Sequence, residues 1–167
     1  FSTEDKMRIG LVSDSHGNME MLKKAVHQMG EVEAIFHLGD YTEDGLTIRQ
    51  WTEVPVFIIK GNMDIYDNEG SLFIKTEIGG KKILACHGHT AHVKNNYATL
   101  YYKALEEAVD IVIFGHTHIP MIETTEQLLM MNPGSVALPH FNGEKTFGIL
   151  TIENGKIRGE IIPLIDE

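Results

Sequence analysis

The chain has 167 residues, of which 43% are hydrophobic, so it can bury one sizeable core and a single globular domain is expected. Its formal net charge of −10 argues against a protein that coats nucleic acid or binds anionic membranes, because either would need a basic face. No apolar run approaches membrane-spanning length, and residues 1–7 lack the pattern of a signal peptide. Cys86 is the only cysteine, which excludes an internal disulfide and agrees with a cytoplasmic location. Met7 could be a natural start, which would make residues 1–6 a leader and residues 7–167 the domain.

The first informative stretch is residues 8–18, Arg-Ile-Gly-Leu-Val-Ser-Asp-Ser-His-Gly-Asn. The apolar run 9–12 predicts a buried parallel strand, which then breaks abruptly into polar residues. Ligands in open α/β sheets bind outside the carboxyl ends of strands, where Asp14 and His16 could turn toward one point. A carboxylate and an imidazole so placed suit a divalent transition metal, although the pattern alone is more often a turn with a capping Asp.

A helix is expected after this loop, with Asn18 as its N-cap and Gly30 as its end. Its buried stripe is predicted to be Leu22, Ala25, Val26 and Met29. The next strand, residues 34–38, runs into Gly-Asp40, the second carboxylate at a strand end. His37 lies inside that strand and reads as a core histidine rather than a ligand.

Three further apolar runs end in polar, ligand-type residues. The run 54–59 comes after a stretch with a weaker helical pattern, residues 42–51, and leads to Gly61-Asn62. A hairpin of residues 72–78 and 81–85 leads to His87-Gly88-His89. The run 110–114 leads to Gly115-His116-Thr117-His118. A helix is expected over residues 96–108, with inward positions Leu100, Tyr101, Ala104, Leu105 and Ala108.

The remaining chain has the pattern of antiparallel strands. They are expected at residues 121–124, 128–131, 146–152 and 156–162, with Asn154-Gly155 as a type I′ turn signal. The first half alternates strand and helix while the second is mostly hairpins. This predicts two stacked sheets with helices outside them and no linker between them.

The candidate ligands form one set of oxygen and nitrogen donors: Asp14, His16, Asp40, Asn62, His87, His116 and His118. They are too many for one tetrahedral ion, whereas two ions that share a bridging carboxylate would use them all. A structural zinc finger is excluded because the chain has no pair of cysteine ligands.

In this order the motifs resemble the five signatures of the calcineurin-like metallophosphoesterases. They are Asp14-x-His16, Gly39-Asp40, Gly61-Asn62, His87-Gly88-His89 and Gly115-His116-Thr117-His118. The small bacterial and archaeal phosphodiesterases resemble this chain most, in length and in the segment Asn132-Pro133-Gly134-Ser135. The resemblance implies a four-layer α-β-β-α sandwich of two mixed sheets.

The resemblance also implies roles for single residues. Asp14, His16 and His118 would hold one metal ion, Asn62, His87 and His116 would hold the other, and Asp40 would bridge the two. Mn²⁺ is the expected ion, with Fe, Zn, Ni or Co as alternatives. His89 would lie close to the site without ligating.

The implied reaction is hydrolysis of a small phosphodiester, or of a phosphomonoester, by a metal-bridging hydroxide that attacks phosphorus in line. In many larger relatives a histidine that protonates the leaving group follows Gly-Asn, but here the residue is Met63, so the general acid is unassigned. Asp64 or His89 could take this role, or the leaving group must be acidic enough to leave unaided. His140 stands where relatives often have Arg. Cys86 ends an apolar strand and is expected to be a buried small hydrophobe rather than a nucleophile.

Two other classes of function compete with the enzyme. The calcineurin-like retromer subunit is similar in fold but works as a protein-interaction scaffold, which has no physical need for all seven donors. A metallo-β-lactamase-type hydrolase would need His-x-His-x-Asp-His on one loop, and neither His-x-His pair continues in that way. A metal-dependent phosphoesterase is therefore expected, and assembly as a homo-oligomer is compatible with the sequence.

Overall fold

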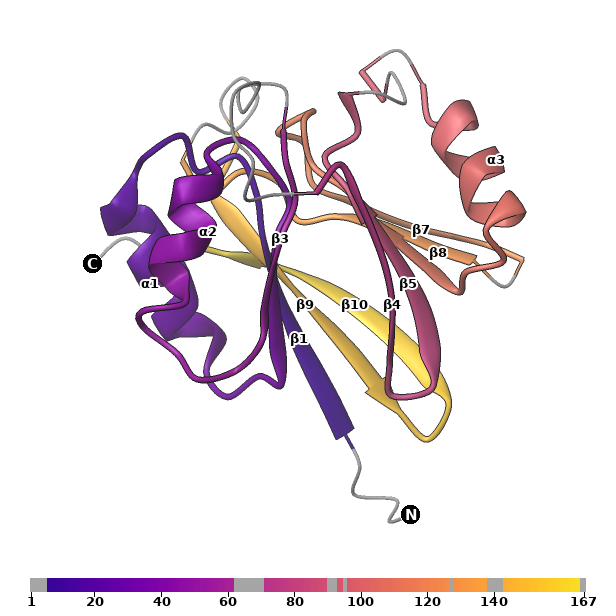
Figure 1. Cartoon of the computed structure of the whole chain (residues 1–167), viewed down its shortest axis with the longest axis horizontal. Coiled ribbons are helices and arrows are strands. Elements are labelled where there is room, and N and C mark those ends of the chain that lie inside the picture. Colours follow the sequence, from indigo (N-terminus) through magenta and orange to yellow (C-terminus); the bar gives the residue numbers. More distant parts are fainter. Residues whose placement is uncertain are drawn as a thin grey trace.

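Two five-stranded sheets lie face to face, with helices on their outer faces (Figure 1). The computed structural model describes residues 6–61, 71–89, 93–94, 96–126, 128–137 and 143–165. Lys6, the last residue of the predicted leader, is the first residue of the first strand.

The first sheet has the strand order β10-β9-β1-β2-β3, in which β1, β2 and β3 are parallel and β9 and β10 are antiparallel. Its strands are β1 (Lys6–Val12), β2 (Ala34–His37), β3 (Val56–Ile58), β9 (Thr146–Glu153) and β10 (Lys156–Pro163). Its outer face is covered by α1 (Met19–Met29) and α2 (Thr42–Ile48), which contribute Leu22, Ala25, Met29 and Ile48 to a buried cluster with Val12, Ile35 and Phe147.

The second sheet has the order β4-β5-β6-β8-β7, with a parallel centre and antiparallel edges. Its strands are β4 (Phe73–Ile78), β5 (Lys81–Cys86), β6 (Ile111–Ile113), β7 (Met121–Thr125) and β8 (Leu128–Asn132). One helix, α3 (Ala98–Glu106), packs on its outer face through Leu100 and Ala104. The inner faces of both sheets share one core, which includes Leu11, Phe36, Ile83, Ile113 and Met131. The four-layer sandwich of two mixed sheets is therefore confirmed.

Helix α1 forms where the sequence predicts it. The Asn18 side chain accepts a hydrogen bond from the backbone N–H of Met21 at 3.2 Å, which satisfies one of the free donors at the helix start. Gly30 follows the helix with φ of +70°, a conformation that L side chains rarely adopt. Leu22, Ala25 and Met29 are buried as expected, while Val26 is half-buried.

Two expectations differ from the structure. Helix α3 ends at Glu106, and Ala108 then adopts φ of +56°, so Val109 points into the core while Leu105 and Ala108 are exposed. The C-terminal part is also not purely antiparallel, because β8 pairs in parallel with β6. The chain then returns to the first sheet through β9 and β10.

The parallel strands of both sheets direct their carboxyl ends to one edge of the molecule, at the top of Figure 1. The loops that follow β1, β2, β3, β5 and β6 start at this edge, and they carry all of the candidate ligands. A ligand site is expected at this edge.

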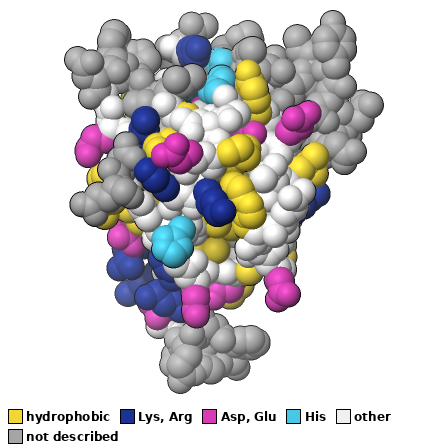
Figure 2. All heavy atoms as spheres, turned by 90° about the vertical axis from the view of Figure 1, so that its left-hand side faces the viewer, with side chains coloured by type: hydrophobic (Ala, Val, Ile, Leu, Met, Phe, Trp, Pro, Cys, Tyr) yellow, Lys and Arg dark blue, Asp and Glu magenta, His cyan; other side chains and the backbone are white. Residues whose placement is uncertain are grey.

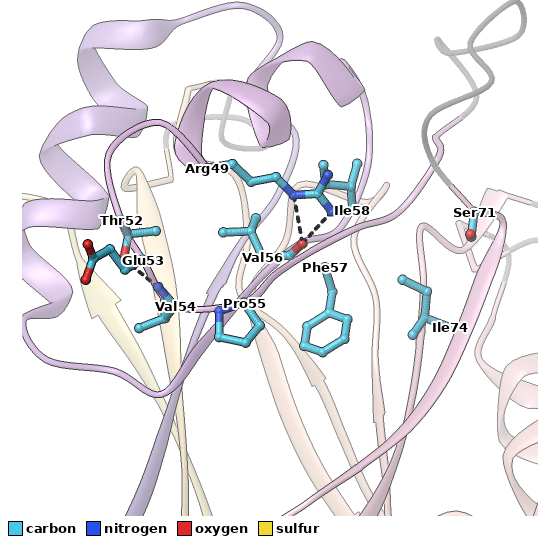
Figure 3. A pocket seen from close by; sticks show the side chains of 10 residues that line it. All are labelled: Arg49, Thr52, Glu53, Val54, Pro55, Val56, Phe57, Ile58, Ser71 and Ile74. Atoms are coloured by element: carbon cyan, nitrogen blue, oxygen red, sulfur yellow. Dashed lines mark hydrogen bonds between the residues drawn. The ribbon is translucent and has the colours of Figure 1, made fainter.

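A different part of the surface lies along the edge strand β3, where a cavity of about 490 Å³ opens (Figure 3). The Arg49 guanidinium donates two hydrogen bonds to the Val56 carbonyl, at 2.9 and 3.3 Å, which fixes the end of α2 against β3. Phe57 and Ile74 supply apolar wall, and none of the candidate ligands lines this cavity.

The outer surface over α1 and α2 carries interspersed basic, acidic and apolar side chains (Figure 2). Within the described ranges, no helix is long and apolar enough to cross a membrane.

Candidate metal centre

The loops at this edge bring six of the seven candidate ligands together. Asp14 and His16 follow β1, Asp40 follows β2, His87 follows β5, and His116 and His118 follow β6. Asn62, Asp64 and Met63 lie outside the described residues, as does His140.

Four of these side chains form a compact cluster: Asp14, His16, Asp40 and His118 offer ligand atoms within 4.8 Å of one another. His118 Nε2 lies 3.3 Å from Asp14 Oδ1, and His16 Nε2 lies 3.4 Å from Asp40 Oδ2. Ligand atoms bound to one transition-metal ion at about 2.0–2.2 Å are roughly 3–3.5 Å apart, so these separations fit a shared cation.

Two atoms of the cluster show why a cation fits it. Asp14 Oδ1 and His16 Nε2 are buried and have no hydrogen-bond partner among the residues that the structure describes. A buried carboxylate oxygen without a partner is costly unless a positive charge compensates it.

A second group of donors lies next to the first cluster and also reaches Asp40. His87 Nε2 lies 3.2 Å from His116 Nδ1 and 3.4 Å from Asp40 Oδ2. His87 Nδ1 lies 2.8 Å from the Leu38 carbonyl. Because a carbonyl oxygen can only accept, Nδ1 carries a proton. In the protonated ring Nε2 donates to Asp40, whereas in the neutral ring Nε2 is left with a lone pair, as in metal-ligating histidines.

The two histidines of this group have opposite pKa shifts. Burial, with the charge of His87 next in size, lowers the pKa of His116 to about 4, so it is neutral at pH 7, as a ligand must be. Burial also lowers the pKa of His87, but its hydrogen bond to Asp40 and the charges of Asp14 and Asp40 outweigh burial and raise it. The carboxylates therefore attract positive charge at this point.

His89 lies beside the second group. Its ring centroid is 5.5 Å from that of His87 and 6.2 Å from that of His116. This half-buried ring is near enough to act on a molecule bound at the centre, but it is not one of the four clustered ligand residues.

The backbone at the centre has an uncommon conformation. Residues with φ between +47° and +72° include Asp14, His16, Asp40, His116 and His118. Non-glycine residues rarely adopt positive φ, and such strain collects at functional sites where surrounding structure enforces it.

The glycines before three candidate ligands leave space for neighbouring ligands. A Cβ on Gly39 would lie 2.2 Å from His87 Nδ1, and one on Gly61 would lie 2.2 Å from Asp40 Oδ1. A Cβ on Gly115 would lie 2.9 Å from Asp14 Oδ2 and 2.0 Å from its neighbour Ser13 Oγ. Each loop therefore packs its backbone directly against the ligand side chains of another loop, which a side chain at these positions would prevent.

Hydrogen bonds from other parts of the chain fix Asp14. Its Oδ2 accepts from Ser13 Oγ at 2.7 Å and from the His116 backbone N–H at 3.1 Å. Ser135 Oγ donates to the Asp14 carbonyl at 2.9 Å. Asn132 Nδ2 donates to the Gly115 carbonyl at 3.1 Å, so the segment 132–135 holds two of the ligand loops.

Asp44 has a role that sequence reasoning missed. Its Oδ2 accepts from Ser15 Oγ at 2.5 Å and from the Gly17 N–H at 2.9 Å, so helix α2 holds the loop that carries Asp14 and His16. The Ser15 hydroxyl proton points to Asp44, so the 2.8 Å contact with His37 requires His37 Nε2 to donate. The only signal in the sequence was an Asp on the buried side of a weak helical pattern.

The Asp44 contacts predict a large effect on stability. Asp44→Ala would leave the buried Ser15 hydroxyl and the Gly17 N–H without this acceptor, so we expect a loss of about 2–3 kcal/mol in the free energy of unfolding. Glu43→Ala, in the same turn but exposed, should cost less than about 0.5 kcal/mol. Denaturant unfolding measures both, and equal losses in the two variants would contradict the anchoring role.

Stability should also depend on pH through His37. Burial lowers its pKa from 6.5 to about 4, so the unfolded chain takes up this proton first as the pH falls. Stability is therefore lost progressively from about pH 6.5 down to about pH 4, by on the order of 3 kcal/mol from this group. The pKa is low because the ring is fully buried and has only its hydrogen bond to Ser15 among the described residues.

Denaturant unfolding of metal-free protein, prepared with a chelator, tests this prediction. The free energy of unfolding is compared between wild type and His37→Gln at several pH values. The pH dependence due to other groups, such as His116, is common to both proteins. We expect the stability advantage of wild type over the variant to shrink across the window, and a constant difference would argue against a neutral buried His37.

Comparison with known proteins identifies a family and several relatives that this chain resembles. The model of the calcineurin-like phosphoesterase superfamily domain matches residues 7–155. The chain is 36% identical over 149 residues to a probable metallophosphoesterase, YsnB, of Bacillus subtilis, covering 89% of this chain and 86% of that protein. It is 29% identical to phosphodiesterase MJ0936 of Methanocaldococcus jannaschii, covering 91% and 97%.

A solved structure has the same fold as this chain. A protein from Streptococcus pneumoniae TIGR4 described as a predicted phosphoesterase superposes with a TM-score of 0.79 and 28% identity, covering 95% of this chain and 90% of that one. The family model, the relatives and the fold are consistent with one another, and the cluster of Asp and His side chains suits a metal-dependent family. The chain belongs to the calcineurin-like phosphoesterase superfamily.

Proposed function

We propose that this chain is a phosphodiesterase with two divalent metal ions in its active site. The observation that carries the proposal is the position of Asp40 Oδ2, which lies 3.4 Å from His16 Nε2 and 3.4 Å from His87 Nε2. One carboxylate oxygen between two groups of donors is the arrangement that a bridging ligand needs.

The donors divide into two sets around Asp40. Asp14, His16 and His118 would hold one ion, and His87 and His116 would hold the other together with Asn62. Two divalent ions held there would lower the pKa of a bridging water and bind phosphate oxygens, which supplies hydroxide for in-line attack on phosphorus at neutral pH. Mixed oxygen and nitrogen donors suit Mn²⁺, with Fe, Zn, Ni or Co as alternatives.

Among the described residues, Cys86 is not a competing nucleophile. Burial raises the pKa of the Cys86 thiol to about 12, so it stays protonated and behaves as a small hydrophobe. His89 is the described residue placed to protonate a leaving group, since it lies beside the His87 and His116 rings. Asp64 is the other candidate, because Met63 cannot transfer a proton.

The substrate that we propose is a small phosphodiester, with a phosphomonoester as the alternative, acted on in the cytoplasm. The name of the phosphodiesterase relative supports a diester for this chain. A protein-interaction scaffold of the same fold is the competing function. Unpartnered buried polar atoms at the cluster favour a bound cation, which a scaffold does not need.

Metal content and activity test the proposal directly. Protein refolded with Mn²⁺ should hold close to two ions per chain by elemental analysis and should cleave bis(p-nitrophenyl) phosphate. The mixed donor set on both sides of Asp40 is the reason. Two bound ions with no turnover would favour the scaffold, and no bound metal would contradict both the metal centre and the enzyme.

Replacing Asp40 tests its role as the shared ligand. Asp40→Asn removes a negative charge between the two ions, so it should weaken both sites, by tenfold or more in each on the scale of a lost charged ligand. His118→Ala removes one donor of the Asp14 set and should lower the affinity of one site only. Calorimetric titration with Mn²⁺ distinguishes the variants, and the same loss of both sites in each would count against bridging by Asp40.

A further inference from the structure

A cavity of about 360 Å³ opens directly beside the metal centre. It is lined by Val93, Lys94, Tyr97, Thr117, His118 and Ile119, and we name it the His118 pocket. Its volume falls in the range of small-molecule sites. His118 is shared, because its ring lines the pocket while its Nε2 lies 3.3 Å from Asp14 Oδ1 in the cluster.

Part of the wall of this pocket is apolar, formed by Val93, Tyr97 and Ile119. Val93 is buried, and the half-buried Tyr97 ring is held against Phe114 at a centroid distance of 5.5 Å. The Ile119 side chain is 42% exposed, so it offers apolar surface to a molecule in the pocket. A ring or aliphatic group that entered the pocket would remove this surface from water.

The polar groups of the pocket differ in whether the protein's own hydrogen bonds already occupy them. The Thr117 hydroxyl accepts from the Ile119 N–H at 3.1 Å and from Asn132 Nδ2 at 3.0 Å, so it is committed to holding its own loop. Lys94 is exposed and carries the only fixed charge among the lining residues. The pocket therefore combines an apolar wall with one cation.

We propose that the His118 pocket binds the organic substituent of the phosphodiester, and that it suits an apolar ring that bears its own negative charge. The inference rests on the proposed function, since it requires the phosphorus to bind at the cluster. A phosphate group there would direct one ester substituent past His118 into the pocket, where Ile119 and Tyr97 contact the ring and Lys94 attracts its charge.

Three phosphonates test the pocket without being hydrolysed, because they have no ester bond. Methylphosphonate, phenylphosphonate and 4-phosphonobenzoate share the phosphorus group and add first a ring and then a carboxylate. With Mn²⁺-loaded protein and calorimetric titration, we expect the ring to strengthen binding about tenfold and the carboxylate to add about threefold.

Two variants separate the features of the pocket. Ile119→Asp should reduce the gain from the ring to about twofold, and Lys94→Ala should abolish only the gain from the carboxylate. Ile122→Asp is the matched control, since Ile122 is 40% exposed and faces Gly159 of β10 instead of the pocket. It should keep both gains.

The outcomes distinguish the pocket from the function. Equal binding of all three phosphonates, or gains that survive Ile119→Asp and Lys94→Ala, would overturn the pocket while leaving the phosphodiesterase intact. No binding by any of them, together with no turnover of bis(p-nitrophenyl) phosphate, would overturn the proposed function and the pocket with it.

Discussion

Asp14 and Asp40 are both buried, at 0% and 3% exposure, and their oxygens belong to one cluster whose ligand atoms lie within 4.8 Å of one another. Two carboxylates in such surroundings repel each other and lose their hydration, which costs several kcal/mol for each charge unless a cation or hydrogen bonds compensate. Asp14 Oδ2 has its hydrogen bonds, but Asp14 Oδ1 accepts no hydrogen bond within the described part of the chain and has only histidine nitrogens, such as His118 Nε2 at 3.3 Å, beside it. The arrangement is therefore stable in the form that binds positive charge, and metal binding should stabilise the fold by mass action.

The two-sheet architecture makes this concentration of charge possible. Parallel strands from both sheets end at the same edge, so ligands far apart in the sequence meet there. The loops are brought close by glycines with no room for a side chain, such as Gly39 against His87. Positive φ at Asp14 and Asp40 turns each carboxylate toward the centre, and the bonds of Asp44 and Ser135 hold that strained backbone in place.

Much of this could be predicted from the sequence, because strand ends and helix periodicity are local signals. The apolar run before Asp14, the capping Asn18 and the stripe of α1 behave as their patterns indicate. Asp44 and the supporting bonds of Asn132 could not be predicted, since their partners are set by tertiary packing. The prediction that Leu105 points inward was wrong for a similar reason, because the helical period alone does not show where α3 ends. The roles of Asn62 and Asp64 stay predictions.

The central claim is that Asp40 lies between two metal ions. Anomalous diffraction from crystals grown with Mn²⁺, recorded near the manganese absorption edge, tests it directly. The account predicts two peaks about 3.5–4 Å apart on either side of the Asp40 carboxylate, one beside Asp14 and His118 and the other beside His87 and His116. A single peak, or two peaks that do not share Asp40, would contradict it.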